Sequence, residues 1–504
     1  MRALSKTKLL AYRQCPKRLW LEIHQPSLRV DSPNTKASFD TGNQVGDIAR
    51  QIYDPKGVGQ FIDLKKDGFD AAFSKTAERL AVAKPIFEAG FVNDGVMAFA
   101  DVMLPLKKKS TLSWKMVEVK SSTSVKDYHR DDVAIQAYVA KGAGVALNSI
   151  SLSYIDSSWV YPGGSNYDGL LVEEDLSDEA FGKELEVIDW ISQAKTIARS
   201  KVEPKITTGE QCNKPYACGF MAYCQSQEPQ AEQPIAWLPN RHSKKLKEWI
   251  AMQSVQKVAI ELKTTPDELL NNLQLRVKKH TLENTVYFDA KGAATDLAPY
   301  KLPAYFLDFE TIQFGVPIWK GTSPYQNIPF QFSVHRLGRN GALEHQSFLD
   351  LSGKDPSKAL AQALIEACPG KGAIFVYNAS FEMGRMGELA QRFPKYKTAL
   401  MALNDRIVDL LPIAQNRYYH PSQEGSWSIK KVLPAIAPDL QYADLTGVQD
   451  GGMAMNAYLE AINAQTSAVR IEEIEQQLIN YCRLDTYAMV RLWKFFSGRK
   501  DLKL

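Results

Sequence analysis

The stretch WKMVEVKSS, residues 114–122, decides how the first part of the chain is expected to fold. Its aromatic and β-branched side chains are typical of a β-strand. Because side chains alternate along a strand, Glu118 and Lys120 share one face while Val119 points to the other. On spacing alone, an ordinary surface ion pair between Glu118 and Lys120 explains this pattern as well as a functional site does.

The run before it, VMAFADVMLP (96–105), has the same strand character and carries Asp101. Two carboxylates that converge from adjacent strands can hold a hard divalent cation, which prefers oxygen ligands. A lysine beside them can position a water molecule or stabilise developing negative charge. Asp101, Glu118 and Lys120 are therefore candidate residues of a metal-dependent site.

Further elements are expected on both sides of these two strands. Expected helices lie at residues 5–14, 39–52, 71–83, 133–141 and 178–198, and further strands at 85–92 and 149–155. The segment is thus expected to be an α/β unit in which three strands are followed by a helix and a fourth strand.

This order, with Asp101, then Glu118-Val-Lys120, then Gln136-Ala-Tyr138 on the following helix, resembles the PD-(D/E)XK nuclease superfamily. Within it the likeness is closest to RecB-type nucleases, including the AddB-like and CRISPR-adaptation iron–sulfur nucleases. The resemblance covers roughly residues 1–226 and implies a restriction-endonuclease-like fold. It implies that Asp101, Glu118, Lys120 and Gln136 are catalytic, with Asp101 and Glu118 as metal ligands.

Two features depart from the family pattern. The helical motif is usually Gln-x-x-x-Tyr, whereas here the tyrosine follows Gln136 by two positions. The metal-binding histidine often found in a Gly-x-x-x-His context is absent, because this chain has Gly42-Asn-Gln-Val-Gly46. Metal coordination is then either incomplete or supplemented, with Glu88 as the candidate supplement.

Four cysteines bracket this segment. Cys15 stands alone near its start, and Cys212, Cys218 and Cys224 fall close together near its end. Because disulfides are disfavoured in the cytosol, clustered cysteines are better interpreted as metal ligands, and four thiolates fit structural zinc or an iron–sulfur cluster. In the iron–sulfur relatives, one N-terminal and three C-terminal cysteines ligate a [4Fe–4S] cluster. The resemblance implies the same cluster here, with zinc as the alternative.

Composition is that of an ordinary globular protein. Of the 504 residues, 45% are hydrophobic and 23% are charged, and this length predicts more than one domain. The formal charge of +4 neither indicates nor excludes a nucleic-acid binder. No apolar run is long enough to span a bilayer and no signal-peptide pattern is present, so we expect a cytoplasmic protein with no membrane partner.

The stretch QSQEPQAEQP (225–234) has the composition of a linker. The expected domains are residues 1–226, a linker and helical connector at 227–300, and a second domain at 301–504.

The second domain begins with the hydrophobic stretch PAYFLDFET (303–311), which places Asp308 and Glu310 on one face of a strand. Further strands are expected at residues 328–337, 343–349 and 373–378, with a helix at 357–368.

Two later helices carry further acidic residues. One opens with Ser380-Phe-Glu382, where Ser380 is expected to cap the first turn. The other begins at about Ile471 and presents Tyr481 and Asp485 one turn apart on one face.

Three antiparallel strands, a helix and a fourth strand resemble the RNase H-like fold, and the motifs resemble DEDD-type 3′–5′ exonucleases of the DnaQ-like group. The likeness covers about residues 300–504. Tyr481 matches the tyrosine of the Tyr-x-x-x-Asp variant, and Glu382 stands where the family usually has aspartate. The resemblance implies that four acids are catalytic metal ligands, namely Asp308, Glu310, Glu382 and Asp485.

Such a site would use two divalent ions about 3.5–4 Å apart to activate a water and stabilise the leaving 3′ oxygen. Four carboxylates offset the charge of these ions and fix their separation. Tyr481 would orient the water, because the unperturbed pKa of tyrosine, about 10, is too high for a base. Any one of these motifs alone fits an ordinary strand end or helix face.

The whole chain resembles a bacterial family that fuses an iron–sulfur RecB-like nuclease to a DEDD exonuclease. The resemblance implies a nuclease dependent on Mg²⁺ or Mn²⁺ that acts on DNA, single-stranded or with free ends, in repair, recombination or defence. Two alternatives stay open: an RNA 3′–5′ exonuclease, and a nucleic-acid-binding adaptor whose N-terminal centre is inactive. Protein partners are not indicated by the sequence.

Overall fold

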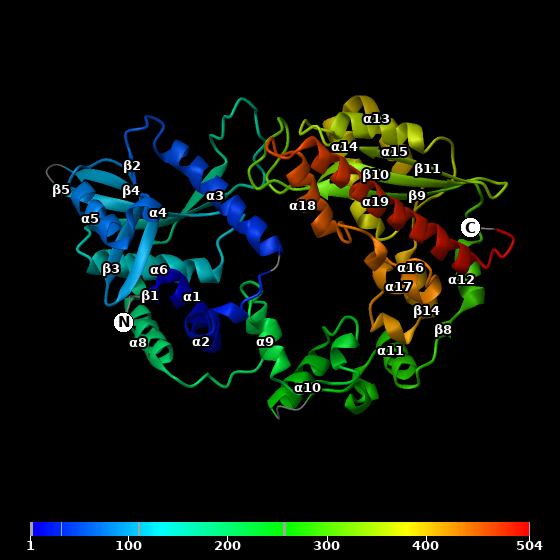
Figure 1. The fold of residues 1–504 in the computed structure, drawn as a ribbon, viewed down its shortest axis with the longest axis horizontal. Coiled ribbons are helices and arrows are strands. Elements are labelled where there is room, and N and C mark those ends of the chain that lie inside the picture. Colours follow the sequence, from blue (N-terminus) through cyan, green and yellow to red (C-terminus); the bar gives the residue numbers. More distant parts are fainter. Residues whose placement is uncertain (1–3, 32, 109–110, 256–258, 503–504) are drawn as a thin grey trace. The chain divides into compact units, whose positions relative to one another are not determined.

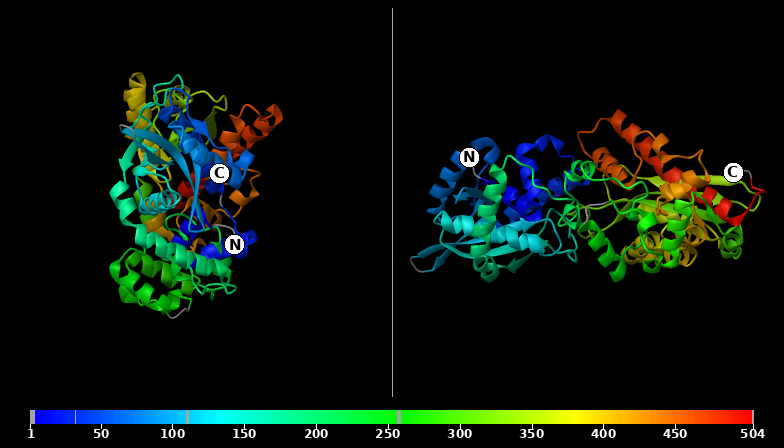
Figure 2. Two further views of the ribbon diagram at one scale, coloured as in Figure 1. Left: turned by 90° about the vertical axis from the view of Figure 1, so that its left-hand side faces the viewer. Right: turned by 90° about the horizontal axis from the view of Figure 1, so that it is seen from below.

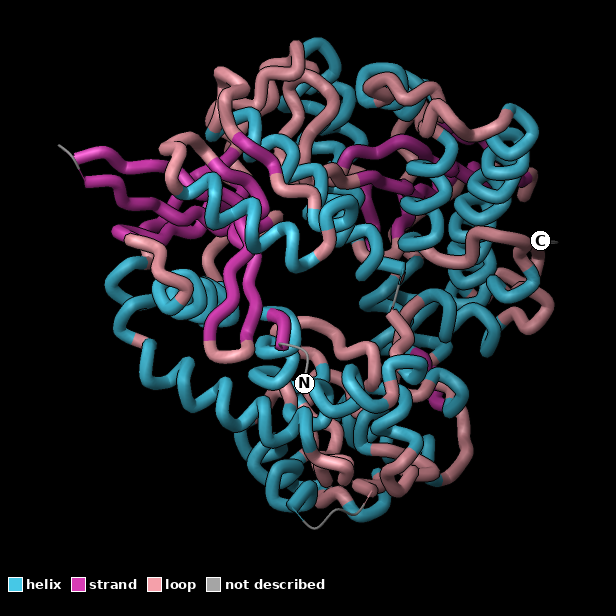
Figure 3. Tube along the Cα trace, turned by 60° about the vertical axis from the view of Figure 1, so that its left-hand side comes forward, coloured by secondary structure: helices cyan, strands magenta, loops and turns pink. Residues whose placement is uncertain are grey.

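The computed structural model of the chain describes residues 4–31, 33–108, 111–255 and 259–502. It is a mixed α/β structure with two compact units. Unit 1 comprises Met1–Glu228 and Phe314–Tyr325, and unit 2 comprises Pro229–Gln313 and Gln326–Leu504. Each unit has its own sheet flanked by helices (Figure 3). The α/β class expected from the sequence is therefore confirmed.

Unit 1 is built on a seven-stranded sheet. Its strands are β1 (Leu4–Ser5), β2 (Gln60–Phe61), β3 (Ile86–Asn93), β4 (Val96–Lys108), β5 (Thr111–Lys120), β6 (Leu147–Ile155) and β7 (Leu171–Asp175). Its helices are α1 (Lys6–Gln14), α2 (Pro16–His24), α3 (Pro33–Tyr53), α4 (Leu64–Asp67), α5 (Phe69–Leu80), α6 (Asp127–Gly142), α7 (Ser177–Gly182), α8 (Glu184–Arg199) and α9 (Met221–Ser226).

The strand order of this sheet is β2-β3-β4-β5-β6-β7, with β1 paired to β4. Strands β3, β4 and β5 form an antiparallel meander, and β6 is parallel to β5. A parallel neighbour requires a crossover connection, and α6 provides it. Figures 1 and 2 show α6 lying along the sheet.

Alternation along the strands decides which side chains meet which helix. Met103 and Met116 are buried in the main core beneath α6, whereas Val102 and Val117 pack with Phe87 on the opposite face. The regular alternation of side chains along β3 is interrupted at Glu88, whose φ is +58°. As a result, Ile86 and Ala89 both pack in the main core, although they are three residues apart.

A short segment from the second half of the sequence belongs to unit 1. The segment Phe314–Tyr325 follows β9 in the chain and packs against the β6–β7 connection. Gly321 N donates to Tyr161 O at 2.8 Å, Tyr161 N donates to Thr322 O at 3.0 Å, and the Tyr325 hydroxyl donates to Ser121 O. Nothing in the sequence pattern indicates this crossing.

Unit 2 is built on a five-stranded sheet. Its strands are β9 (Ala304–Ile312), β10 (Ile328–Leu337), β11 (Leu343–Leu349), β12 (Ile374–Val376) and β13 (Ile407–Asp409), and β8 (Tyr287–Phe288) pairs separately with β14 (Tyr418–Tyr419). Its helices are α10 (Lys244–Val255), α11 (Asn272–Leu282), α12 (Ala290–Leu297), α13 (Ser357–Ala367), α14 (Ala379–Arg392), α15 (Lys397–Asn404), α16 (Leu411–Arg417), α17 (Ile429–Ile436), α18 (Gly451–Ala461) and α19 (Ala468–Ser497).

The order of the five-stranded sheet is β11-β10-β9-β12-β13. Strands β9, β10 and β11 are antiparallel, and β12 and β13 run parallel to β9. Both faces are covered. Phe306 packs in the core that contains Trp493 of α19, whereas Tyr305 and Leu307 pack in the core that contains Leu360 of α13. This two-sided burial explains the unbroken hydrophobic run at the start of β9.

Two expected elements differ in detail. The helix expected at 178–198 is two helices, because α7 ends at Gly182 and α8 begins at Glu184; glycine is a weak helix former. The helix expected to be capped by Ser380 begins at Ala379 instead, so Ser380 lies in its first turn and donates to Asn378 Oδ1 at 3.0 Å. Within the described ranges, none of the helices has the length and apolar character that a membrane crossing requires.

Candidate functional site

Glu118 and Lys120 lie in a buried polar cluster between β5 and α6. Lys120 Nζ donates to Glu118 Oε1 at 2.5 Å and to Asp132 Oδ2 at 2.6 Å. Gln136 Nε2 donates to Glu118 Oε2 at 2.6 Å. The side chain of Glu118 is only 2% exposed, so the ion pair exists but is not an ordinary surface pair. Three of the expected residues of this centre therefore come together.

Asp101 joins the same cluster from β4. Its Oδ2 accepts a hydrogen bond from Val119 N at 2.6 Å. Glu88 stands opposite Asp101 in the antiparallel register, between the pairs Phe87–Val102 and Ala89–Ala100. Burial and then the charge of Glu118 raise the pKa of both Glu88 and Asp101. Three carboxylates thus share one buried region, and a cation would relieve their repulsion.

Lys6 and Asp132 are members of this cluster that sequence reasoning missed. Ser5 caps α1, and Lys6 is the first residue of that helix. Lys6 Nζ lies 2.8 Å from Glu118 Oε1 and 3.0 Å from Asp132 Oδ1. Lys6 is brought there by the pairing of β1 with β4, which joins residues far apart in the sequence. Asp132 lies one helical turn before Gln136, and that spacing was the available signal.

Each lysine of this cluster lies between two carboxylates, because Lys6 and Lys120 both pair with Glu118 and with Asp132. Burial acts to lower the pKa of Lys120, but Asp132 and Glu118 outweigh it and raise that pKa. Burial acts to raise the pKa of Asp132, but Lys120 and Lys6 lower it. The two lysines and Asp132 are therefore charged at neutral pH, and the ammonium groups stand beside the oxygens of Glu118.

The other half of the expected helical motif points elsewhere. Tyr138 lies two residues after Gln136 on α6 and packs against the main core of unit 1, where the carboxylates that act on its hydroxyl are Asp94 and Glu184. The family's Gln-x-x-x-Tyr spacing is shortened in this chain, and of the two motif residues only Gln136 belongs to the polar cluster.

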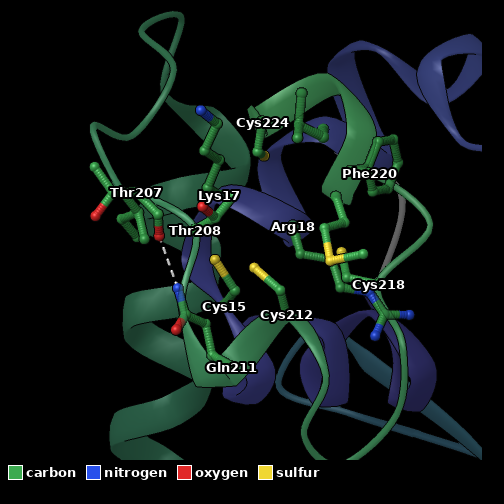
Figure 4. A pocket seen from close by; sticks show the side chains of 13 residues that line it. Cys15, Lys17, Arg18, Thr207, Thr208, Gln211, Cys212, Cys218, Phe220 and Cys224 are labelled. Atoms are coloured by element: carbon green, nitrogen blue, oxygen red, sulfur yellow. Dashed lines mark hydrogen bonds between the residues drawn. The ribbon is translucent and has the colours of Figure 1, made fainter. Parts of the chain in front are cut away.

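All four bracketing cysteines line one pocket of unit 1. Cys15 lies between α1 and α2, and the other three come from the segment that ends in α9. Figure 4 shows Cys15 and Cys212 pointing into this pocket, with Cys218 and Cys224 beside it. Gln14 Nε2 ties the two segments together, because it donates to Gln211 O and to Tyr216 O, each at 2.8 Å.

Of the four cysteines that line the pocket, Cys212 and Cys224 are buried and Cys15 and Cys218 are half-buried. Burial raises the pKa of Cys224 to about 11 and also raises the pKa of Cys218, and the neighbouring cysteines act in the same direction. Two groups act to lower the pKa of Cys218, namely the Phe220 N–H and the guanidinium of Arg18. The ammonium of Lys17 acts to lower the pKa of Cys224. These groups would stabilise negatively charged sulfur ligands.

The separation of the sulfurs bears on which group they fit. A tetrahedral zinc ion holds its sulfurs about 3.8 Å apart, because each Zn–S bond is about 2.3 Å. In the described part of the chain, no three of these sulfurs all lie within 4.8 Å of one another. An iron–sulfur cluster places its own iron and sulfide atoms between the thiolates and so needs wider spacing. Four thiols that line one pocket match the donor set of either group.

The acidic residues of unit 2 converge where β9 meets α19. Asp308, Glu310, Tyr481 and Asp485 line one cleft of about 380 Å³. Asp308 and Glu310 project from β9 toward α19, on the same face as Phe306. Burial, and then Asp485, raise the pKa of both Asp308 and Glu310, and burial raises the pKa of Asp485 to about 6.

Glu382 is the most enclosed of the expected acids. It lies on α14, is 2% exposed, and its Oε2 has no hydrogen-bond partner. Its charge contributes to the raised pKa of Asp308, so it approaches the same group of acids. Burial, with the charge of Asp409, raises the pKa of Glu382 to about 8.

Three further residues, Tyr442, Lys430 and Cys482, lie at this centre. The Tyr442 hydroxyl donates to Asp485 Oδ1 at 2.5 Å. Lys430 lines the cleft, and its Nζ lies 5.1 Å from the ring centroids of both Tyr442 and Tyr481. Cys482 Sγ lies 3.9 Å from Asp308 Oδ2. The neighbouring Lys431 instead pairs with Glu424 at the surface.

Comparison with known proteins gives one match to a family. A family described as a domain of unknown function (DUF2779) matches residues 305–428. None of the curated proteins matches the chain. The matched range contains Asp308, Glu310 and Glu382 but ends before Tyr481 and Asp485. Over those residues, the chain is similar to a family whose function its description leaves open.

Proposed function

We propose that the chain is a metal-dependent nuclease with a 3′–5′ exonuclease centre in unit 2 and a RecB-like centre in unit 1. The observation that carries the proposal is the convergence of Asp308, Glu310, Tyr481 and Asp485 on one cleft. Glu382 is close enough for its charge to contribute to the raised pKa of Asp308. These residues lie on three separate elements, and buried acids that repel one another are typical of a divalent-metal site.

The sheet of unit 2 supports the assignment to the RNase H-like fold. The resemblance implies three antiparallel strands, a helix and a fourth strand, and β9, β10, β11, α13 and β12 follow in that order, with β13 as a further parallel strand. The candidate acids lie on the central strand β9 and on the helices that cover it.

In the exonuclease centre, the four acids would hold two Mg²⁺ or Mn²⁺ ions, which supply an activated water and stabilise the leaving oxygen. Tyr481 would orient that water by hydrogen bonding. Tyr442 holds Asp485 in place through its hydroxyl. Lys430 provides a positive charge at the cleft where a phosphate of the nucleic acid would bind.

In unit 1, Asp101 and Glu118 would hold a divalent ion, with Glu88 as a further carboxylate where the family has a histidine. Lys120 would stabilise the charge on the phosphate, and Gln136 orients Glu118 by donating to its Oε2. The four cysteines would hold a [4Fe–4S] cluster that fastens the two ends of the unit and is not itself part of the catalytic machinery.

A second function for unit 1 is favoured by one observation. Both Lys6 and Lys120 contact Glu118 Oε1, so two ammonium groups already balance the charge that a metal ion would balance. Unit 1 would then hold a nucleic-acid strand without cleaving it, while unit 2 performs the hydrolysis.

An end-labelling assay separates these possibilities. Purified protein is incubated with Mg²⁺ or Mn²⁺ and with single-stranded DNA or RNA labelled at the 3′ or the 5′ end. We expect the 3′ label to be released first from DNA. Asp308→Asn should abolish this release, whereas Asp439→Asn, at a surface carboxylate of the same unit that pairs with Arg491, should not.

The role of unit 1 follows from the same assay. If Glu118→Gln removes a second cleavage activity, unit 1 is a nuclease; the exposed Glu186→Gln is its control. If Glu118→Gln changes nothing, unit 1 acts in binding. Digestion of RNA in preference to DNA would assign the RNA alternative. No cleavage of either substrate with either ion would refute the proposal.

A further inference from the structure

We propose that Asp308, Glu310 and Cys482 form a binding site for a thiophilic divalent ion such as Zn²⁺, held by two carboxylates and one thiolate. Its consequence for activity rests on the proposed function, because an ion bound there would occupy the carboxylates that hydrolysis needs. The metal site itself stands on the geometry alone.

The three side chains are close enough to share one ion. One ligand atom of each lies within 4.8 Å of the other two, and no other group of three metal-ligating residues in the described ranges meets this criterion. Cys482 Sγ lies 3.9 Å from Asp308 Oδ2. Bonds of about 2.3 Å to sulfur and about 2.0–2.2 Å to oxygen would span that separation at an angle of about 120–130°.

The carboxylate of Glu310 provides an independent indication of a ligand. Glu310 is 7% exposed, yet among the described residues nothing donates a hydrogen bond to its carboxylate or forms an ion pair with it. A buried carboxylate without a partner is costly, and a bound cation would compensate it. One oxygen of this carboxylate lies within 4.8 Å of a ligand atom of each of the other two residues.

The donor set also indicates which ion. Carboxylates and water suit Mg²⁺ and Mn²⁺, whereas a thiolate selects softer ions such as Zn²⁺. Cys482 is fully buried on α19, directly after Tyr481. Binding of Zn²⁺ would replace the S–H bond of Cys482 with an S–Zn bond and release the proton to solvent. Mg²⁺ would leave that S–H bond intact.

The consequence is competition between two kinds of ion at one centre. Zn²⁺ held by Cys482 would occupy Asp308 and Glu310 and would fix α19 at the position next to Tyr481. The exonuclease would then be inhibited by Zn²⁺ while it is supported by Mg²⁺ or Mn²⁺.

The site is tested by titrating the full-length protein with Cd²⁺ in excess Mg²⁺ and following the ultraviolet charge-transfer absorption of cadmium–thiolate bonds. Three proteins are compared: wild type, Cys482→Ser, and the control Cys368→Ser, whose buried thiol lies elsewhere in unit 2. The four cysteines of unit 1 contribute equally to all three. We expect wild type and Cys368→Ser to agree and Cys482→Ser to show less absorption. Equal absorption in Cys482→Ser would overturn the proposal.

A second variant tests the carboxylate side. Asp308→Asn keeps the thiol and should weaken Cd²⁺ binding at this site by about tenfold or more; unchanged affinity would overturn the proposal. Should Cys482→Ser fail to fold, Cys482→Ala is measured in its place. In the 3′-end assay, Zn²⁺ should inhibit the wild type at a lower concentration than it inhibits Cys482→Ser. Complete lack of nuclease activity would refute the proposed function, while the Cd²⁺ spectra would still decide on the site.

Discussion

Lys6 connects the first turn of the protein to the centre of unit 1. Its ammonium group contacts both Glu118 and Asp132, and Lys120 contacts the same two side chains. Within the larger cluster, these two positive and two negative charges form a largely buried set of four ion pairs. A metal ion that binds Glu118 must therefore displace at least one ammonium group, so metal affinity in unit 1 depends on Lys6 as well as on the acids.

Removal of this charge should destabilise unit 1. Lys6→Met leaves Glu118 and Asp132 with one cation in place of two, and breaking a buried ion pair costs about 3–5 kcal/mol. Urea unfolding should show a fall of this order for Lys6→Met. The exposed Lys65→Met should change stability by less than about 0.5 kcal/mol. Equal effects of the two substitutions would contradict the buried set of charges.

Glu382 predicts an unusual pH dependence of unit 2 in the absence of metal. Its pKa is about 8 in the folded protein, against an ordinary value of 4.5. Between these values the folded chain keeps a proton that the unfolded chain has lost. The free energy of unfolding should therefore fall as the pH rises from 4.5 through 8, by about 1.4 kcal/mol per pH unit for one group.

The measurement is chemical unfolding at several pH values with a chelator present. Glu382→Gln should flatten part of the decline, and saturating Mg²⁺ should oppose it by binding the ionised carboxylates. A wild-type stability that rises over this interval would contradict the assignment.

At the level of elements, the strands were the most predictable part of the fold. The expected strands at 328–337 and 343–349 coincide with β10 and β11, because alternation and turn residues are local signals. The helix expected at 178–198 was wrong in one respect, since its apolar periodicity continues across the break at Gly182. Periodicity reports on a buried face and does not detect an interruption of the backbone.

The candidate sites were predictable only where a motif is short and local. Glu118 and Lys120 are two residues apart, and Tyr481 and Asp485 are four apart, so each pair could be placed on one face of one element. Lys6 could not, because β1 pairs with β4 across about ninety residues of sequence. Tyr442 was missed because it lies outside the long helices and strands, in a short turn that reaches Asp485.

The pocket of cysteines predicts that α2 and the segment ending in α9 depend on a bound metal group. Cys15→Ser or removal of the metal by a chelator should loosen residues 203–226, and limited proteolysis should cleave there first. Anaerobically purified wild type should show the broad visible absorption of an iron–sulfur cluster, which Cys15→Ser should lose. Cys368→Ser should retain both the visible absorption and the resistance of residues 203–226 to proteolysis. Zinc without iron in the purified protein would refute the cluster.

At the level of the whole molecule, the segment Phe314–Tyr325 makes unit 1 discontinuous in sequence. Tyr325→Phe removes the hydrogen bond to Ser121 O, which lies next to Lys120. We expect it to destabilise unit 1 by about 1 kcal/mol and to increase hydrogen exchange at the end of β5. Tyr154→Phe, a tyrosine of the same unit outside the segment, serves as control. Unchanged exchange in Tyr325→Phe would show that this hydrogen bond does not stabilise the end of β5.

The same discontinuity has a consequence for biosynthesis. When the ribosome has made residue 228, the first part of unit 1 has been synthesised. The twelve residues Phe314–Tyr325, which also pack into unit 1, have not yet been made. Those residues arrive only after β9, the central strand of the other sheet, has been translated. Unit 1 therefore cannot reach its final packing before synthesis of unit 2 has begun, and the two halves mature together although each has its own core.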